Sequence, residues 1–196
     1  MAGDKQAARV WRERHGLAAC QALPTGRHYY PRRGARRMTL TGIGYDSHRL
    51  IEGRRLILGG VEIPSELGLY GHSDADVLTH AVIDALLGAA GLGDVGEHFP
   101  DSDERYRDAD SIELLQTVLP RVVAQGLELV NLDSTVVMER PKLGPYREAI
   151  RERLAGALGL APGRVNVKAT TGEGIGFVGR GEGVAALAVV SLRIAD

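Results

Sequence analysis

Segments with the hydrophobic pattern of β-strands alternate with segments that have the pattern of α-helices along most of this chain. The patterns predict strands at residues 39–46, 54–63, 127–138, 164–169 and 183–194, and helices at residues 74–91, 110–125 and 146–158. Such interleaving favours an α+β fold, in which a mixed β-sheet packs against about three helices on one of its faces. The expected strand at residues 54–63 is interrupted by Gly59-Gly60.

The helix at residues 74–91 has the clearest pattern. Asp74 can cap its amino-terminal end, and Gly91 can end it. The apolar stripe of this helix consists of Val77, Leu78, Ala81, Val82, Ala85, Leu86 and Ala89. In the next helix, Pro120 is expected to kink or end the helix, because proline lacks the backbone N–H donor.

The composition is that of one globular domain. The chain has 196 residues, of which 44% are hydrophobic and only 5% aromatic, so the core must consist of Leu, Val, Ile and Ala. No apolar run approaches the roughly 20 residues of a membrane-spanning helix, and we expect no membrane association. The single cysteine, Cys20, excludes an internal disulfide framework and fits a reducing compartment, so we expect a cytoplasmic protein.

The charge is distributed unevenly. Residues 1–37 carry nine Lys and Arg against two acidic residues, a balance of +7, whereas the rest of the chain balances to −8. The basic segment could be an organelle-targeting peptide, a basic arm for nucleic acid or anionic lipid, or sequence upstream of a start at Met38. Targeting peptides are usually rich in Ser, which this segment lacks, so we favour the start at Met38. We therefore expect a basic, disordered extension at residues 1–38 and one folded domain at residues 39–196.

Three of the six histidines occur within the 35 residues that begin at Asp46. Asp46 and His48 are two residues apart, so on an extended strand both side chains point to the same face. His80 lies on the expected helix and can supply a third ligand. Two imidazoles and one carboxylate, with a fourth position open, are typical of a catalytic zinc site. The sequence therefore predicts a metal site at Asp46, His48 and His80.

Two assignments around this site stay open. A lone histidine is more often a surface or hydrogen-bonded residue, and only the whole set favours a metal. His72 could be a ligand in an alternative arrangement. Asp76, one helical turn before His80, could orient that imidazole by hydrogen bonding.

Glycine-rich segments follow the strand expected at residues 164–169. Thr170-Thr171-Gly172-Glu173-Gly174 and residues 176–183 could present backbone amides to a phosphate group. The sequence is neither a Walker motif nor a dinucleotide-binding fingerprint, and by itself it is more typical of a corner between two strands. In the turn at residues 139–143, Arg140 and Lys142 could face an anionic ligand.

Taken together, eight short motifs resemble the 2-C-methyl-D-erythritol 2,4-cyclodiphosphate synthase family over residues 41–194. The motifs are Gly42-Ile-Gly-Tyr-Asp-Ser-His48, His72-Ser-Asp-Ala-Asp76 with His80, Asp84-Ala-Leu-Leu-Gly88, Gly93-Asp-Val-Gly96, Phe99-Pro-Asp-Ser-Asp103, Arg140-Pro-Lys142, Val165-Asn-Val-Lys-Ala-Thr-Thr171 and Gly176-Phe-Val-Gly-Arg-Gly-Glu-Gly183. Each motif alone is a weak signal, whereas the whole set in this order is very specific.

The resemblance implies an enzyme of non-mevalonate isoprenoid biosynthesis that forms a homotrimer with active sites between its subunits. Its substrate would be 4-diphosphocytidyl-2-C-methyl-D-erythritol 2-phosphate. The 2-phosphate would attack the β-phosphorus, so that a cyclic diphosphate forms and CMP leaves. By matching motif, Asp46, His48 and His80 would bind Zn²⁺, and Glu173 would bind a second divalent ion, Mg²⁺ or Mn²⁺.

The same resemblance implies the roles of further side chains. His72 and Thr171 would be catalytic, stabilising the transition state. The implied substrate-binding residues are Ser73, Asp94, Val95, Gly96, Phe99, Pro100, Asp101, Ser102, Asp103, Met138, Glu139, Arg140, Pro141, Lys142, Leu143, Thr170, Gly172, Phe177 and Arg180. Of these, Ser73 and Asp101 would contact the erythritol part, Asp94 and Gly96 the ribose, and the backbone of residues 138–143 the cytidine.

Three positions depart from the family pattern. Ile43 stands where many members carry a histidine, and Gly172 replaces the usual Thr or Asn before Glu173. Ala75 occupies a position where glycine is common.

Two other functions compete with this interpretation. A metal-dependent phosphohydrolase could use the same two histidines and carboxylate to activate water. A trimeric scaffold or nucleic-acid binder could act through the basic segment, but the balance of −8 over the rest of the chain is ill suited to a phosphodiester backbone. We therefore expect a small-molecule substrate and no nucleic-acid partner.

Overall fold

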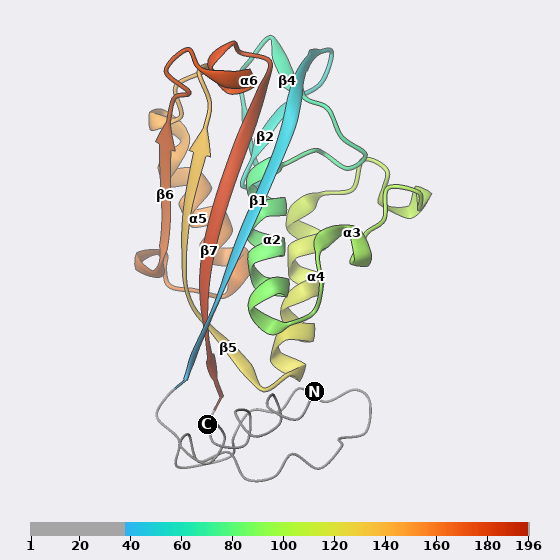
Figure 1. Ribbon diagram of the computed structural model, residues 1–196, viewed down its shortest axis with the longest axis vertical. Coiled ribbons are helices and arrows are strands. Elements are labelled where there is room, and N and C mark those ends of the chain that lie inside the picture. The colour runs from blue at the N-terminus through green and yellow to red at the C-terminus, as the bar shows by residue number, and fades with distance from the viewer. Residues whose placement is uncertain (1–37, 196) are drawn as a thin grey trace, which may run out of the picture. The chain divides into compact units, whose positions relative to one another are not determined.

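The computed structural model describes residues 38–195 (Figure 1). Apart from Met38, the basic extension expected at residues 1–38 lies outside the described residues.

The centre of the fold is a five-stranded mixed sheet with the strand order β4-β1-β7-β5-β6. Its strands are β1 (Thr39–Glu52), β4 (Leu67–Leu69), β5 (Leu127–Val137), β6 (Val165–Thr170) and β7 (Gly183–Ile194). β1 pairs antiparallel with β4 and β7, β5 pairs antiparallel with β7, and β5 and β6 run parallel. The order places three inter-strand steps between β1 and β6.

The segment expected to form one interrupted strand at residues 54–63 is a hairpin of β2 (Leu56–Leu58) and β3 (Val61–Ile63). Its turn consists of Gly59 and Gly60, with positive φ angles of 58° and 71°. Two consecutive positive φ angles characterise the two-residue hairpin turn, and glycine adopts them without strain.

Three long helices lie on one face of the sheet: α2 (Val77–Ala90), α4 (Ser111–Ala124) and α5 (Arg147–Leu158) (Figure 1). α2 packs on β1 and β7, α4 packs on α2, and α5 packs on β6. α3 (Val95–His98) and α6 (Gly176–Gly179) are single turns, and η1 (Glu104–Tyr106), η2 (Gly144–Tyr146) and η3 (Pro162–Arg164) are 3₁₀ turns. The expected α+β fold is confirmed. Within residues 38–195, no helix has both the length and the apolar character to cross a membrane.

The structure corrects the expected cap of one helix and narrows the expectation for another. Asp76, and not Asp74, caps α2, because its carboxylate accepts the Thr79 N–H at 3.0 Å. Of the two outcomes expected at Pro120, a kink or an end of the helix, the end is excluded, since α4 continues to Ala124. The expected stop at Gly91 is confirmed: this residue has a φ of 68°, the left-handed conformation that ends many helices.

α2 packs directly against the backbone of β1 at two glycines. A Cβ atom added at Gly44 would lie 1.9 Å from the carbonyl oxygen of Ala81, and one added at Gly42 would lie 2.0 Å from that of Ala85. Any larger residue would therefore force strand and helix apart. Because side chains alternate along a strand, Asp46 and His48 lie on the same face of β1 as these glycines.

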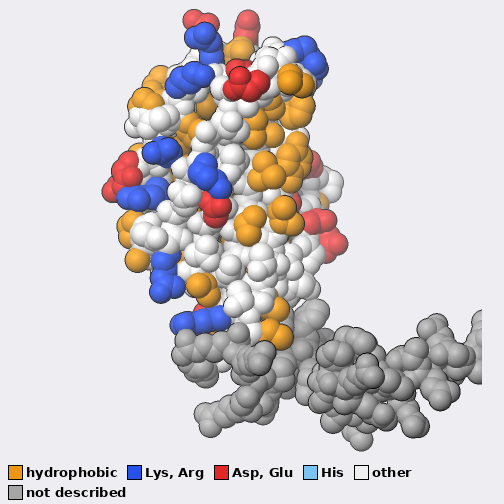
Figure 2. Space-filling view, turned by 60° about the vertical axis from the view of Figure 1, so that its left-hand side comes forward, with side chains coloured by type: hydrophobic (Ala, Val, Ile, Leu, Met, Phe, Trp, Pro, Cys, Tyr) orange, Lys and Arg blue, Asp and Glu red, His pale blue; other side chains and the backbone are white. Residues whose placement is uncertain are grey.

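The other face of the sheet carries no helix of residues 38–195 (Figure 1). Ile43 and Tyr45 on β1 are 69% and 53% exposed, and their cross-strand partners Val189 and Leu187 on β7 are each 37% exposed. Figure 2 shows hydrophobic side chains grouped on the exposed surface. We call Ile43, Tyr45, Leu187 and Val189 the apolar sheet patch. A contiguous exposed apolar patch is typical of a protein interface.

We predict that Gly44→Ala lowers the free energy of unfolding by about 1–3 kcal/mol or more, because the added methyl group meets helix backbone that cannot rotate away. Gly156→Ala is the matched control, since an added Cβ at Gly156 in α5 meets nothing within 4 Å. The control should raise stability by about 0.5–1 kcal/mol, the usual gain of alanine over glycine in a helix. Urea unfolding of the wild type and both variants measures these changes. A Gly44→Ala variant as stable as the wild type would contradict the close contact.

Candidate metal centre

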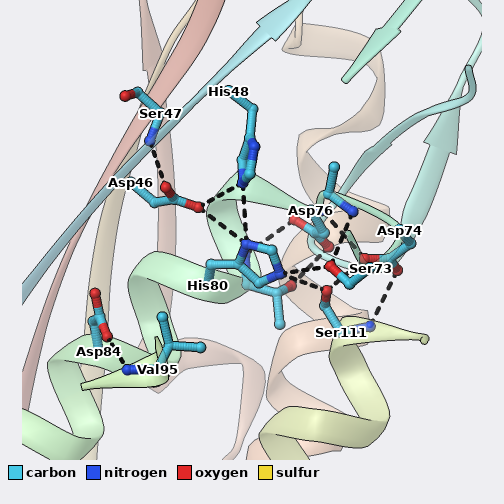
Figure 3. A network of polar contacts seen from close by, with 12 residues as sticks. Asp46, Ser47, His48, Ser73, Asp74, Asp76, His80, Asp84, Val95 and Ser111 are labelled. Atoms are coloured by element: carbon cyan, nitrogen blue, oxygen red, sulfur yellow. Dashed lines mark hydrogen bonds and ion pairs between the residues drawn. The ribbon is translucent and has the colours of Figure 1, made fainter. Parts of the chain in front are cut away.

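β1 and α2 together bring Asp46, His48 and His80 to one point (Figure 3). Asp46 Oδ2 lies 3.0 Å from His48 Nε2 and 3.0 Å from His80 Nδ1. The two imidazole nitrogens are 3.3 Å apart. The three predicted ligand residues therefore converge, although they are up to 34 positions apart in the sequence.

The outer nitrogens of both imidazoles make hydrogen bonds that leave the inner nitrogens facing Asp46. His48 Nδ1 lies 2.7 Å from the carbonyl oxygen of Tyr70, which can only accept, so Nδ1 carries the proton. His80 Nε2 lies 2.9 Å from Ser111 Oγ and 3.1 Å from Ser73 Oγ. Lone pairs that converge without an intervening proton are typical of a metal site.

This donor set fits a divalent zinc ion. Two imidazole nitrogens and one carboxylate oxygen are the ligands that a catalytic zinc commonly takes, with the fourth position left for substrate. The side chains of Asp46, His48 and His80 are 25%, 20% and 12% exposed, so the cluster is sheltered but still open on one side. Asp46, His48 and His80 would hold the ion.

The electrostatics of the cluster favour a cation. Burial alone would raise the pKa of Asp46, but hydrogen bonds and charge from His48 and His80 outweigh it and hold this pKa far below its usual range. Burial alone would lower the pKa of His48, but the hydrogen bond and the charge of Asp46 outweigh it and raise this pKa above its ordinary value. The carboxylate therefore attracts positive charge, and a proton on His48 competes with a metal for the same place.

A pocket of about 370 Å³ opens beside the three residues. Its lining includes these predicted substrate contacts and the predicted catalytic histidine: His72, Ser73, Val95, Gly96, Phe99, Pro100 and Asp101. His72 Nε2 is buried and has no hydrogen-bond partner among residues 38–195. His72 does not belong to the converging set, so the alternative that made it a ligand is not supported.

Three predicted substrate residues lie beside this pocket without lining it. Asp94 caps α3 by accepting the Glu97 N–H at 3.0 Å, and Asp103 accepts a hydrogen bond from the Arg105 N–H at 3.0 Å. Ser102 is exposed in the turn between them. Asp84 on α2 accepts the Val95 N–H at 2.7 Å, which ties the α3 segment to the helix that carries His80 (Figure 3).

The expectation that Asp76 orients His80 is wrong. The Asp76 carboxylate is fully buried and accepts the N–H groups of Gly59 and Gly60 at 2.9 and 2.6 Å, so it holds the β2–β3 hairpin against the start of α2. The residues that contact the outer nitrogen of His80 are Ser73 and Ser111. Ser111 gave no signal in the sequence, because only the packing of α4 on α2 brings it to His80.

The remaining predicted residues form a second group at the ends of β5 and β6. The Met138 N–H donates to the Thr170 carbonyl at 2.9 Å, and the Gly172 N–H donates to Glu139 Oε1 at 2.8 Å. Thr171 Oγ1 donates to the carboxylate of Glu173. A pocket of about 740 Å³ here is lined in part by Glu139, Arg140, Pro141, Lys142 and Arg180. The other predicted residues of this region are Leu143, which is buried, and Phe177, which is 37% exposed.

The two groups are separated within one chain. Three inter-strand steps of about 4.8 Å place β6, which carries Thr170, about 14 Å across the sheet from the metal-ligand strand β1. The two pockets share no lining residue.

Zinc affinity should fall as the pH drops through the raised pKa of His48, because the imidazole must release its proton to bind a metal. Because this pKa lies above the ordinary value of 6.5, we expect a loss of about tenfold per pH unit from pH 6.5 down to about pH 5, as one proton competes with the ion. Competition titration with a chromophoric chelator measures this dependence. An affinity that stays constant over this range would contradict the assignment of His48 as a ligand.

Comparison with known proteins places these observations in a family. The family model of the YgbB family matches residues 39–193. The 2-C-methyl-D-erythritol 2,4-cyclodiphosphate synthase of Gloeobacter violaceus is 63% identical over 152 residues, which cover 78% of this chain and 93% of that protein. The enzyme of the same name from Symbiobacterium thermophilum is 60% identical over 150 residues, which cover 76% of this chain and 96% of that protein.

Solved structures agree with the sequence relatives. The bifunctional IspDF from Campylobacter jejuni matches with a TM-score of 0.79 and 46% identity, covering 82% of this chain and 44% of that one. A 2C-methyl-D-erythritol-2,4-cyclodiphosphate synthase in its CDP-bound form matches with a TM-score of 0.72 and 43% identity, covering 78% of this chain and 99% of that one. The resemblance seen in the motifs is thus confirmed over the folded domain, and this chain belongs to the YgbB family, the family of 2-C-methyl-D-erythritol 2,4-cyclodiphosphate synthases.

Proposed function

We propose that this protein converts 4-diphosphocytidyl-2-C-methyl-D-erythritol 2-phosphate to 2-C-methyl-D-erythritol 2,4-cyclodiphosphate and CMP, a step of non-mevalonate isoprenoid biosynthesis. An oxygen of the 2-phosphate forms a bond to the β-phosphorus. The bond between the β-phosphorus and the bridging oxygen breaks, and its electron pair leaves with CMP. The substrate supplies its own nucleophile, so no side-chain nucleophile is needed.

The observation that carries this proposal is the convergence of Asp46, His48 and His80 beside a pocket, in a chain about 60% identical to synthases of this name. Asp46, His48 and His80 would hold a zinc ion there, which would supply positive charge to the phosphates of the substrate. The protein's contribution is to position the two phosphates and to neutralise charge that develops between them, which is the main source of rate enhancement in phosphoryl transfer.

The other side chains would act by contact with the substrate. The buried Nε2 of His72, which has no hydrogen-bond partner among residues 38–195, would bond a phosphate oxygen. Ser73 and Asp101 line the same pocket, where the erythritol part would lie. Thr171 would stabilise the transition state from the second group, and Glu173 would hold a second divalent ion, Mg²⁺ or Mn²⁺. The backbone of residues 138–143 and Thr170 would hold the cytidine.

We further propose a homotrimer in which each active site forms between two subunits. Two observations support this assembly. The metal ligands line one pocket, and residues 139–142 line another that shares no lining residue with it. In addition, β6, which leads to Thr171, lies about 14 Å from β1 across the sheet of one chain. The apolar sheet patch leaves Ile43 and Tyr45 more than half exposed, which a subunit interface would cover.

The reaction is tested by incubating the purified protein with the diphosphocytidyl substrate and Zn²⁺ plus Mg²⁺. Mass spectrometry and phosphorus NMR should detect the cyclic diphosphate and CMP. Chelation should abolish turnover, and His80→Ala should lower kcat/KM more than about 100-fold, because loss of a ligand exceeds the effect of losing an outer hydrogen-bond partner. Linear phosphates that have incorporated solvent oxygen would contradict the proposal and favour a phosphohydrolase.

The interfacial site is tested by complementation between two inactive variants. His80→Ala and Thr171→Ala subunits, each with a different affinity tag, are co-expressed in equal amounts. Each mixed trimer has one site of three in which an intact metal half meets an intact Thr171. Mixed trimers purified through both tags should therefore have about a third of the wild-type activity. Mixed trimers without activity would contradict a site shared between subunits.

A further inference from the structure

The outer nitrogen of the proposed metal ligand His80 is held by a residue that none of the motifs includes. Ser111, the first residue of α4, is fully buried, and its Oγ lies 2.9 Å from His80 Nε2. Behind Ser111 lies the carboxylate of Asp74, in the segment between β4 and α2 (Figure 3).

The hydrogen bonds determine where the proton on His80 lies. Ser111 Oγ donates its only proton to Asp74 Oδ1, and the Ser111 N–H donates to Asp74 Oδ2 at 3.1 Å. The Asp76 N–H also donates to Asp74 Oδ1, at 3.2 Å. A carboxylate in contact with three donors accepts from all of them. With its proton committed, Ser111 Oγ can only accept from His80, so Nε2 carries the imidazole proton and Nδ1 keeps its lone pair.

The direction of the hydrogen bond between His80 and Ser111 is important, because a second hydroxyl contacts the same imidazole nitrogen. Ser73 Oγ lies 3.1 Å from the same nitrogen and accepts the Ala75 N–H at 3.2 Å, which leaves its own proton free to donate. If Ser73 donated to Nε2, the imidazole proton would lie on Nδ1 and would point at Asp46 Oδ2, 3.0 Å away, where the metal binds. Because Ser111 Oγ can only accept, it favours the proton on Nε2 and disfavours a hydrogen bond donated by Ser73 to that nitrogen.

We propose that Ser111, held by Asp74, is a positioning residue that fixes His80 in the tautomer able to bind a metal. The inference rests on the metal site of the proposed function. Metal-bound imidazoles commonly donate their other N–H to an acceptor of this kind, which sets the ring orientation and strengthens the ligand. A purely structural role, in which Asp74 only fastens the start of α4, would leave the His80 tautomer and the metal affinity unchanged.

The first experiment measures zinc affinity of the full chain by chelator competition. Ser111→Ala should weaken binding about 10–100-fold, the usual effect of removing such a partner. Ser134→Ala is the matched control: Ser134 on β5 is 1% exposed, and its Oγ donates to the Asn166 carbonyl at 2.9 Å. The control loses one buried serine hydrogen bond outside the metal centre and should bind zinc as the wild type does.

Asp74→Asn is a second variant, and it should also weaken zinc binding, because an amide can donate to Ser111 Oγ and so free the serine proton to point at His80. Nitrogen-15 NMR of histidine in the metal-free protein at about pH 8, above the ordinary range of imidazole pKa values, reads the tautomer directly. The wild type should show the proton on Nε2 of His80, and Ser111→Ala should show it moved at least partly to Nδ1. The wild-type spectrum keeps the test valid even if a variant folds poorly.

Two results would overturn the inference alone: a wild-type His80 with its proton on Nδ1, or a folded Ser111→Ala variant that binds zinc within about twofold of the wild type, below the 10–100-fold effect of such partners. A wild-type protein with no zinc binding that His80→Ala abolishes would overturn the metal site, and with it the proposed function. The two failures are therefore distinguishable.

Discussion

The backbone contact of α2 with β1 at Gly42 and Gly44 sets the geometry on which the metal centre depends. Because neither glycine has a Cβ, the helix approaches the strand so closely that an added atom would lie within 2.0 Å of a helix carbonyl. On the helix, His80 is next to Ala81, whose carbonyl contacts Gly44. On the strand, Asp46 is two residues after Gly44. The same contact that packs the core therefore brings helix and strand ligands within about 3 Å of each other.

Around this contact, each ligand is held from behind by a group of defined hydrogen-bonding direction. The Tyr70 carbonyl holds the proton of His48 on the outer nitrogen, and Ser111 with Asp74 does the same for His80. Three inner acceptors then face one another, an arrangement that repels itself unless a cation or a proton lies between them. The affinity of the site for positive charge therefore depends in part on Tyr70, Ser111 and Asp74, which would not contact the ion themselves.

The sequence predicted the main elements and the three side chains that converge at the candidate metal centre, because strand and helix patterns are local information. Strand alternation places Asp46 and His48 on one face, and the apolar stripe identified α2 as a helix. The cap was misassigned because Asp74 and Asp76 both precede the stripe and are equally good capping residues. The tertiary structure distinguishes the two. The N–H groups of Gly59 and Gly60 in the hairpin turn donate to Asp76, whereas Asp74 accepts from Ser111.

Other features could not be read from the sequence, because they depend on tertiary packing. Ser111 reaches His80 only through the packing of α4 on α2. The three-residue β4 is too short to give a pattern, although Tyr70, just after it, fixes His48. The positive φ angles of Ala75 and Glu173, 58° and 51°, mark two site loops in a conformation that a non-glycine side chain rarely adopts. The second pocket likewise depends on tertiary packing, because its lining combines Leu50 of β1 and Leu67 of β4 with residues 139–142, which follow β5.

The most direct measurement is X-ray absorption spectroscopy at the zinc edge of the zinc-loaded wild-type protein. We expect a shell of two imidazole nitrogens at about 2.0–2.1 Å and light oxygen scatterers at about 2.0–2.2 Å, with one imidazole lost in His80→Ala. A shell that contains sulfur, or oxygen ligands without imidazole, would contradict the claim that Asp46, His48 and His80 form the metal centre.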